Sequence, residues 1–186
     1  WQLPDEKINK ADEIIGKYNP FGCNFEDANK KANDNYIIKY TCGVAIMELP
    51  AFVIAHLWAK AGNYPADGFS YPYQVCINFW SILVVVIGLW FLRKNLLNRF
   101  SDSTIAFILF ALCFASNLYN FTSFCGNMSH SYLFTLYVFI IYLLDKLYKR
   151  PNYPIAMLLG LLAGLAVLTR PTEIVCMIPI VLWRIS

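Results

Sequence analysis

The residues of this 186-residue chain best suited to chemistry are polar side chains at the ends of apolar segments. Arg170 follows a long apolar run and precedes Pro171, which disfavours helical geometry at the arginine. A guanidinium at such a helix end suits a phosphate or carboxylate partner, because its donors form a planar fork. Lys39, in front of another apolar segment, is the second candidate cation. The structural alternative is an arginine that snorkels to the membrane surface and pairs with Glu173.

A second group of polar residues is predicted to line a substrate pocket. Asn127 and His130 interrupt an apolar stretch, Glu48 lies inside another, and Tyr40 precedes it. In the simpler interpretation, Asn127 and His130 only form a loop, and Glu48 belongs to the wet face of an interfacial helix. The six cysteines are widely spaced and form no C-x-x-C motif, so no metal site is predicted. A phosphate-binding loop and a catalytic triad pattern are also missing from the sequence.

The composition excludes a soluble globular domain. Hydrophobic residues make up 58% of the chain and charged residues 15%, against about 25% charged residues in ordinary soluble domains. No charged residue occurs between Ser103 and Leu144. A core of that size does not fit a soluble chain of this length, so we expect an integral, multi-pass membrane protein. No block of lysine and arginine indicates a nucleic-acid partner.

The elements that must position these residues follow from apolar runs of about 20 residues, the length that crosses a bilayer. Residues 1–40 are polar and predicted to form an extracytoplasmic loop. Residues 41–60 contain Glu48 and Pro50 and are predicted to form a juxtamembrane or interfacial helix, followed by an outer loop at 61–73. Residues 74–186 are predicted to form transmembrane helices, at about 74–92, 103–119, 129–145, 153–169 and 173–186, the last one truncated.

Two shorter signals refine this plan. A polar hinge is predicted at 120–131, between two apolar spans. Gly160 and Gly164 form a G-x-x-x-G pattern, which predicts a face for close helix packing.

The positive charges predict the orientation of the helices. Lysines and arginines gather in two loops that fall on the same side of the membrane, which is therefore predicted to be cytoplasmic: Arg93, Lys94 and Arg99 in one, Lys146, Lys149 and Arg150 in the other. The loops at 61–73 and 120–131 contain no lysine or arginine and are predicted to lie outside. Arg170 then lies on the outer side, which positive residues normally avoid.

The order of these elements resembles the GT-C glycosyltransferase superfamily, in the branch of dolichyl-phosphate-mannose–protein mannosyltransferase-like enzymes (family 39, with the aminoarabinose transferases). The resemblance covers nearly the whole chain. Lys39–Tyr40–Thr41 opens a helix that closes with His56–Leu57–Trp58–Ala59–Lys60–Ala61–Gly62, similar to the end of a juxtamembrane helix in that family. The run from Gly160 to Arg170, followed by Pro171, is similar to the family's Gly- and Leu-rich helix that ends in a cation.

The resemblance implies an all-α, polytopic transmembrane helix bundle of GT-C type, with an outer loop carrying juxtamembrane helices. It implies transfer of a sugar from a polyprenyl-phosphate donor to a glycan, lipid or protein acceptor, on the extracytoplasmic face of a bacterial inner membrane. Arg170 and Lys39 are then expected to bind the donor phosphate. His130, Asn127, Glu48 and Tyr40 are expected to line the substrate pocket. No cofactor is expected with certainty, and a need for a divalent metal stays open.

The chain also departs from the family pattern. Residues 121–131 contain no acidic residue, and no proline follows Lys39. The family's catalytic aspartate follows the first membrane helix, a region expected to precede Trp1. Because the chain does not begin with Met and ends inside an apolar run, we expect an internal piece of a longer protein that is inactive by itself.

Two other function classes remain open at this stage. A membrane transporter predicts facing polar residues at the middle of the bilayer, and the central parts of these spans carry few. A non-catalytic scaffold subunit is the third interpretation.

Overall fold

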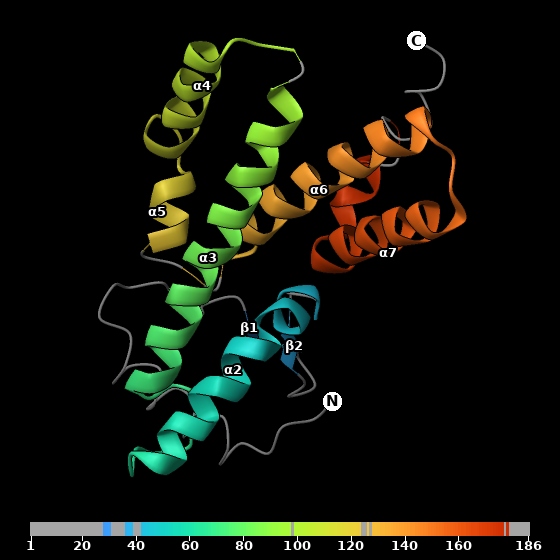
Figure 1. Ribbon diagram of the computed structural model, residues 1–186. Coiled ribbons are helices and arrows are strands. Elements are labelled where there is room, and N and C mark those ends of the chain that lie inside the picture. Colours follow the sequence, from blue (N-terminus) through green and yellow to red (C-terminus); the bar gives the residue numbers. More distant parts are fainter. Residues whose placement is uncertain are drawn as a thin grey trace.

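The computed structural model describes residues 28–30, 36–38, 42–97, 99–123, 126, 128–176 and 178. Within these ranges the protein is predominantly helical (Figure 1). Its helices are α2 (Gly43–Ala61), α3 (Tyr71–Leu96), α4 (Asp102–Phe114), α5 (Leu118–Ser123), α6 (Ser129–Lys149), α7 (Tyr153–Thr169) and the 3₁₀ helix η1 (Pro171–Cys176). Two short strands, β1 (Ala28–Lys30) and β2 (Tyr36–Ile38), pair antiparallel with Asn29 opposite Ile37. This strand pair lies in the segment predicted to be only a polar loop.

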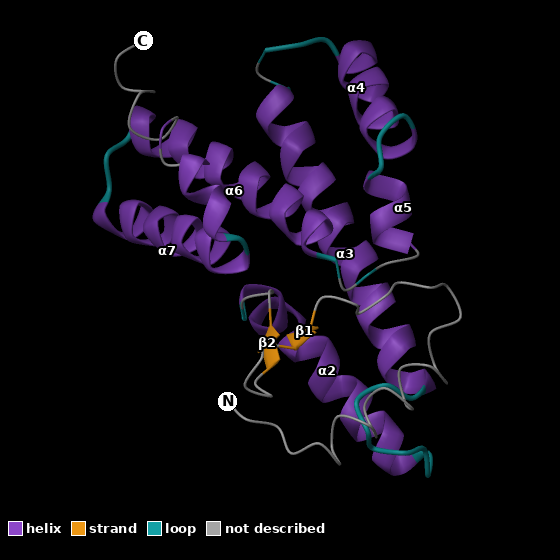
Figure 2. Cartoon of the chain, turned by 180° about the vertical axis from the view of Figure 1, so that it is seen from behind, coloured by secondary structure: helices purple, strands orange, loops and turns teal. Residues whose placement is uncertain are grey.

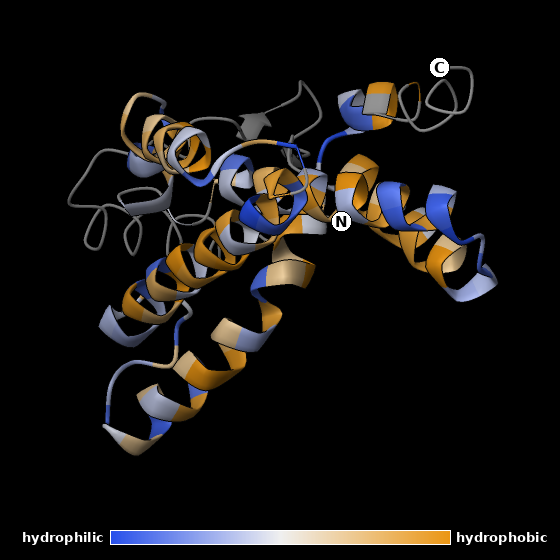
Figure 3. Ribbon diagram, turned by 45° about the horizontal axis from the view of Figure 1, so that its top comes forward, coloured by the Kyte–Doolittle hydropathy of each residue, from blue (hydrophilic) through white to orange (hydrophobic). Residues whose placement is uncertain are grey.

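Three helices of the described chain, α2, α3 and α6, are long and apolar enough to cross a membrane. The apolar helices α4 and α7 are shorter, with 13 and 17 residues. Hydrophobic residues, drawn in orange, occur along all of these helices (Figure 3). Many large apolar side chains point outward, and Phe79, Phe107 and Met157 are 67%, 72% and 78% exposed. Lipid is the solvent that accommodates such a surface, so the length and composition of the helices indicate a membrane protein.

Helices α2 and α3 pack together because small residues line one side of α2. Ala51, Ala55 and Ala59 recur at every fourth position and are buried, and Tyr73 of α3 packs against the last two. Small side chains let two helix backbones approach closely, which is the usual way helices pack in lipid. The Trp80 indole N–H donates to the Met47 carbonyl at 2.9 Å, which adds a polar contact between the two helices.

The connection from α2 to α3 is a tight turn with local caps. Asn63 adopts a positive φ of 55°, a conformation that asparagine tolerates better than most residues. The Asp67 carboxylate accepts from the backbone N–H groups of Phe69 and Ser70, both at 2.8 Å. Pro72 follows in the first turn of α3, so this helix begins slightly earlier than the predicted residue 74.

Helix α3 crosses α6 at a close contact between Gly88 and Thr135. A Cβ atom at Gly88 would lie 2.6 Å from Thr135 Oγ1 and 3.3 Å from its Cα. The Thr135 hydroxyl donates to the Val84 carbonyl at 3.0 Å. Further along, the Phe91 ring packs against Phe139, with ring centroids 4.7 Å apart. A hydrogen bond and ring packing therefore hold the two helices together across this crossing.

The α6–α7 hairpin projects to one side of α3, whereas α4 and α5 lie beside α3 on the other side (Figure 2). A cluster of buried apolar residues joins the two helices of the hairpin: Ile140, Leu143, Leu144, Leu159 and Ala163. Gly160 and Gly164 do not belong to this contact, because no described residue outside α7's own backbone lies within 4 Å of a Cβ built at either position. The predicted packing role of the G-x-x-x-G pattern is therefore wrong for the described chain, and Leu159, Ala163 and Ala166 form the buried side of α7.

Two other predicted boundaries are corrected. The helix predicted at 103–119 ends at Phe114, because the Ser116 hydroxyl donates to the Leu112 carbonyl at 2.5 Å and accepts from the Leu118 N–H. Helix α5 then begins, so residues 118–123 are helical where the hinge at 120–131 was predicted. The span predicted at 173–186 begins instead as the 3₁₀ helix η1, and most of its remainder lies outside the described residues.

The α3–α6 contact predicts an unusual response to a Gly→Ala substitution. In a helix this change normally gains up to about 1 kcal/mol from helix propensity. Gly88→Ala should instead destabilise the protein, by about 1–3 kcal/mol, because the new methyl group overlaps Thr135. Unfolding in mixed micelles with increasing denaturing detergent measures the difference.

Gly160→Ala is the matched control, since it is also a helical glycine but has open space around it. It should leave stability unchanged or raise it. Equal effects of the two substitutions would contradict the described crossing of α3 and α6.

Candidate functional site

Polar side chains from several elements meet at the amino-terminal end of α6. We call this group the polar junction: Thr122, His130, Ser131, Thr169 and Arg170. The carboxyl end of α7 reaches the junction beside the start of α2, where a Cβ atom at Gly43 would lie 2.5 Å from Thr169 N. Thr122, Ser131 and Thr169 are buried, with exposed fractions of 6%, 0% and 3%. The junction therefore joins the ends of α2, α5, α6 and α7.

Arg170 and His130, both predicted site residues, lie in direct contact. The Arg170 Nη2 atom is 3.1 Å from His130 Nε2. A guanidinium can only donate hydrogen bonds, so His130 Nε2 accepts, and the ring proton of the neutral imidazole lies on Nδ1. The His130 ring also stacks on Phe121 of α5, with centroids 4.4 Å apart and an interplanar angle of 19°. The stacking and the hydrogen bond together fix the orientation of the imidazole.

The position of Arg170 follows from the proline after it. Arg170 is extended, with φ −145° and ψ 120°, and its N–H still donates to the Ala166 carbonyl at 3.0 Å. Pro171 disfavours a helical residue before it, so α7 stops there and the arginine side chain leaves at the helix end. The predicted end of this helix at Thr169 is confirmed.

Glu173 does not pair with Arg170. Its carboxylate instead accepts a hydrogen bond from the Tyr137 hydroxyl of α6, and its backbone N–H donates to the Arg170 carbonyl at 2.9 Å. Within the described chain, the recorded side-chain partner of Arg170 is the neutral ring of His130. The positive charge of Arg170 is therefore not balanced by a contacting carboxylate among these residues.

Buried hydroxyl and amide groups hold the α5–α6 turn in place. The Thr122 and Ser131 hydroxyls lie 3.1 Å apart, and Thr122 also donates to the Leu118 carbonyl. The Asn78 side-chain oxygen of α3 accepts from the Gly126 N–H at 3.1 Å. Any side chain at Gly126 would collide with Asn78, so only glycine fits this approach. These bonds place His130 opposite Arg170.

Glu48, the third described site residue, faces α6 from α2. Its carboxylate lies close enough to the Tyr132 hydroxyl for the two groups to interact. The geometry is not that of a formed hydrogen bond, because Glu48 Oε1 and the Tyr132 hydroxyl are both buried without a partner. The Ser81 hydroxyl on α3 is a third such atom. Buried polar atoms without partners are rare in folded proteins.

The structure tests only part of the predicted site. Arg170 and His130 are brought together, whereas no recorded hydrogen bond or ion pair joins Glu48 to them. Lys39, Tyr40 and Asn127 lie outside the described residues. No group of three metal-binding side chains occurs among the residues that the structure describes.

Sequence reasoning missed three aromatic residues of the site. Phe121 stacks on His130, Tyr137 binds Glu173, and Tyr132 faces Glu48. In the sequence they are indistinguishable from the lipid-facing and packing aromatics of a membrane protein. Tyr132 and Tyr137 lie three or four positions from buried residues of α6. This helical spacing was the only signal in the sequence.

The Arg170–His130 contact predicts a tautomer that can be measured. This chain contains two histidines, so ¹⁵N-histidine labelling gives ring-nitrogen signals from two imidazoles, with Nδ1 and Nε2 observed for each. His130 should show an unprotonated Nε2 and a protonated Nδ1 near neutral pH. Arg170→Leu removes the donor, so His130 should shift toward the Nε2-protonated form that predominates in free histidine.

His56 provides the internal control, because its partner is the Tyr73 hydroxyl at 2.6 Å, not an arginine. Its signals should stay unchanged in Arg170→Leu, and His130→Asn assigns the two rings. A protonated Nε2 on His130 in the unmodified protein would rule out the described hydrogen bond.

Comparison with known proteins identified no relative of this chain. No protein-family model, curated protein or solved structure matches the chain.

Proposed function

We propose that the protein is a polytopic membrane glycosyltransferase of GT-C type, which takes a sugar from a polyprenyl-phosphate donor on the extracytoplasmic face of a bacterial inner membrane. One observation carries the proposal. Arg170 presents a guanidinium at the end of the apolar helix α7, and its side-chain partner among the described residues is a neutral imidazole instead of a carboxylate. A charge placed in this way is available for an anionic ligand.

The surroundings of Arg170 favour an anion as well. Helix α6 begins beside it, and its N-cap, Met128, supplies no side-chain hydrogen bond to the first turn. The amino end of a helix carries a partial positive charge and unused N–H donors, which together attract phosphate groups. His130 takes one guanidinium donor, and the other N–H groups of Arg170 can bind phosphate oxygens in a bidentate way.

The chemistry of the proposed reaction assigns a role to each predicted residue. An acceptor hydroxyl attacks the anomeric carbon, a carboxylate takes its proton, and the bond from that carbon to the phosphate oxygen breaks. Arg170, with Lys39 as the second cation, would stabilise the charge that grows on the departing lipid phosphate. His130, Asn127, Glu48 and Tyr40 would line the pocket for the sugar and acceptor.

Membrane transport is the second candidate, and a different observation favours it. Glu48 and Tyr132 lie inside helices that are long enough to cross the membrane, and the carboxylate and the hydroxyl lie close enough to interact. Ionisable groups in such positions often mark ion or proton pathways. A transporter predicts that Glu48→Gln abolishes flux across the membrane of liposomes, whereas Arg170 is not required for this flux.

The proposed enzyme predicts a large effect of Arg170→Ala on turnover. Loss of one charged donor at a developing oxyanion typically lowers the rate about 10²–10³-fold. Transfer from a radiolabelled polyprenyl-phosphate sugar, in membranes that contain the complete protein, measures the effect. Arg170→Lys should restore part of the activity because it keeps the charge but loses the planar fork.

Arg93→Ala is the matched control. It also removes one arginine, but Arg93 lies in the last turn of α3, away from the polar junction. It pairs only loosely with Asp102, at 4.0 Å. The control should insert, fold and turn over normally. Normal sugar transfer by a folded Arg170→Ala protein would refute the assignment of Arg170 to the donor phosphate. If neither the unmodified protein nor any variant transferred sugar, transport or a scaffold role would become the favoured function.

A further inference from the structure

A second site lies at the opposite end of α6, away from the polar junction. The turn from α6 into α7 borders an open pocket of about 540 Å³. Its lining includes Lys146, Lys149 and Arg150, together with Asp145. Three positive charges therefore surround one negative charge in this pocket. The proposed glycosyltransferase reaction uses none of these residues.

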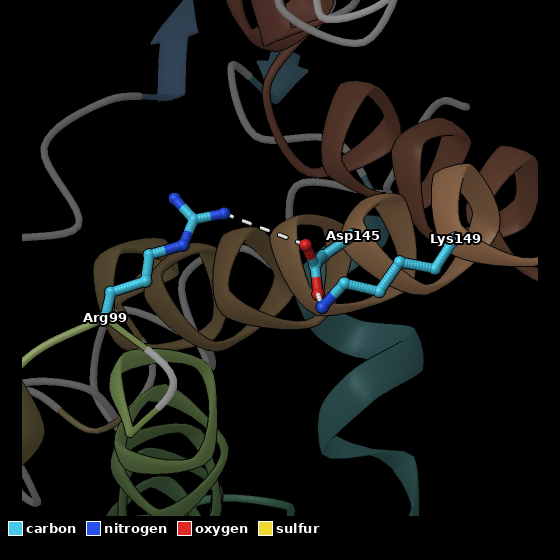
Figure 4. A network of polar contacts seen from close by, with 3 residues as sticks. All are labelled: Arg99, Asp145 and Lys149. Carbon is cyan, nitrogen blue, oxygen red and sulfur yellow. Dashed lines mark hydrogen bonds and ion pairs between the residues drawn. The ribbon is translucent and has the colours of Figure 1, made fainter.

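The negative charge of the pocket is already engaged. Asp145 accepts from Lys149 Nζ at 2.7 Å, and Arg99, from the chain just after α3, approaches the same carboxylate at 3.7 Å (Figure 4). The Lys149 side chain is 63% exposed, so this pair contributes little stability. Lys146 and Arg150 have no recorded ion-pair partner among the residues that the structure describes. The pocket therefore keeps a surplus of positive charge.

The same pocket borders the apolar surface of the helices. Tyr142 and Ile155 contribute to its lining beside the charged residues. Exposed apolar side chains follow along α7, where Met157 and Leu158 are 78% and 46% exposed. A ligand with an anionic head and an apolar tail matches this arrangement.

We propose that this pocket binds the phosphate of an anionic phospholipid, taken from the leaflet at that end of the helices. Lys146 and Arg150 contact the phosphate oxygens, and the acyl chains pass Tyr142 and Ile155 into the surrounding lipid. Basic pockets between membrane helices are a recognised setting for such headgroups, where each cation near the surface adds to the binding. The site is independent of the sugar-transfer proposal and stands if that proposal fails.

Native mass spectrometry of the purified protein in detergent tests this site, with phosphatidylglycerol and phosphatidylcholine of identical acyl chains as probes. Phosphatidylglycerol should bind more tightly. The double substitution Lys146→Gln with Arg150→Gln should weaken phosphatidylglycerol binding about 10–30-fold and leave phosphatidylcholine binding unchanged. Lys146 and Arg150 are exposed, so the variant should fold, and each single substitution should give an intermediate loss.

Arg93→Gln with Lys94→Gln is the matched control. It removes the same charge from the same end of the helices, but from residues outside the pocket, where Lys94 Nζ lies 3.7 Å from the centroid of the Trp90 ring. Phosphatidylglycerol binding should stay within about 2-fold of the unmodified protein. An equal loss in the control would show diffuse attraction and overturn the proposal. Displacement of the lipid by millimolar inorganic phosphate would overturn it as well, by assigning the pocket to a soluble anion.

Discussion

The close contact between α3 and α6 at Gly88 and Thr135 is the constraint on which the rest of the arrangement depends. The absence of a side chain at Gly88 lets Thr135 approach near enough to donate to the Val84 carbonyl. In lipid, packing and such hydrogen bonds replace the hydrophobic effect as the force between helices. Because α6 is held at this point, its amino end meets α5 and the end of α7, and its carboxyl end meets the chain after α3. The two candidate sites lie at these two ends.

The chemistry of the two ends differs although both are positively charged. At the polar junction a single arginine is oriented by His130, which is itself held by Phe121 and by the Thr122–Ser131 contact. An oriented charge of this kind suits the recognition of one phosphate at a defined position, as catalysis requires. At the α6–α7 turn the charges are more numerous and more exposed. That arrangement is better suited to binding a mobile lipid headgroup than to positioning a phosphate that takes part in a reaction.

The helices were predictable because apolar runs in a membrane protein leave few other choices for the backbone. The end of α7 at Thr169 followed from Pro171, and the shared side of the two basic loops agrees with the Arg99–Asp145 ion pair. The Arg170–His130 contact was not predictable, because the residues are 40 positions apart and their meeting depends on how α6 and α7 pack. The G-x-x-x-G prediction failed for a related reason. A small-residue pattern shows that close packing is possible, but not which side of the helix a neighbour covers.

The central claim is that Arg170 holds a lipid-linked phosphate at the polar junction. A cryo-electron microscopy structure of the complete protein, in nanodiscs with a non-hydrolysable polyprenyl-phosphonate sugar analogue, tests it most directly. The account predicts phosphonate density within hydrogen-bond distance of the Arg170 guanidinium, with His130 still in contact with the arginine and the polyprenyl chain leaving along the helices into lipid. An analogue bound elsewhere, with Arg170 turned away from it or paired with a carboxylate, would contradict the account.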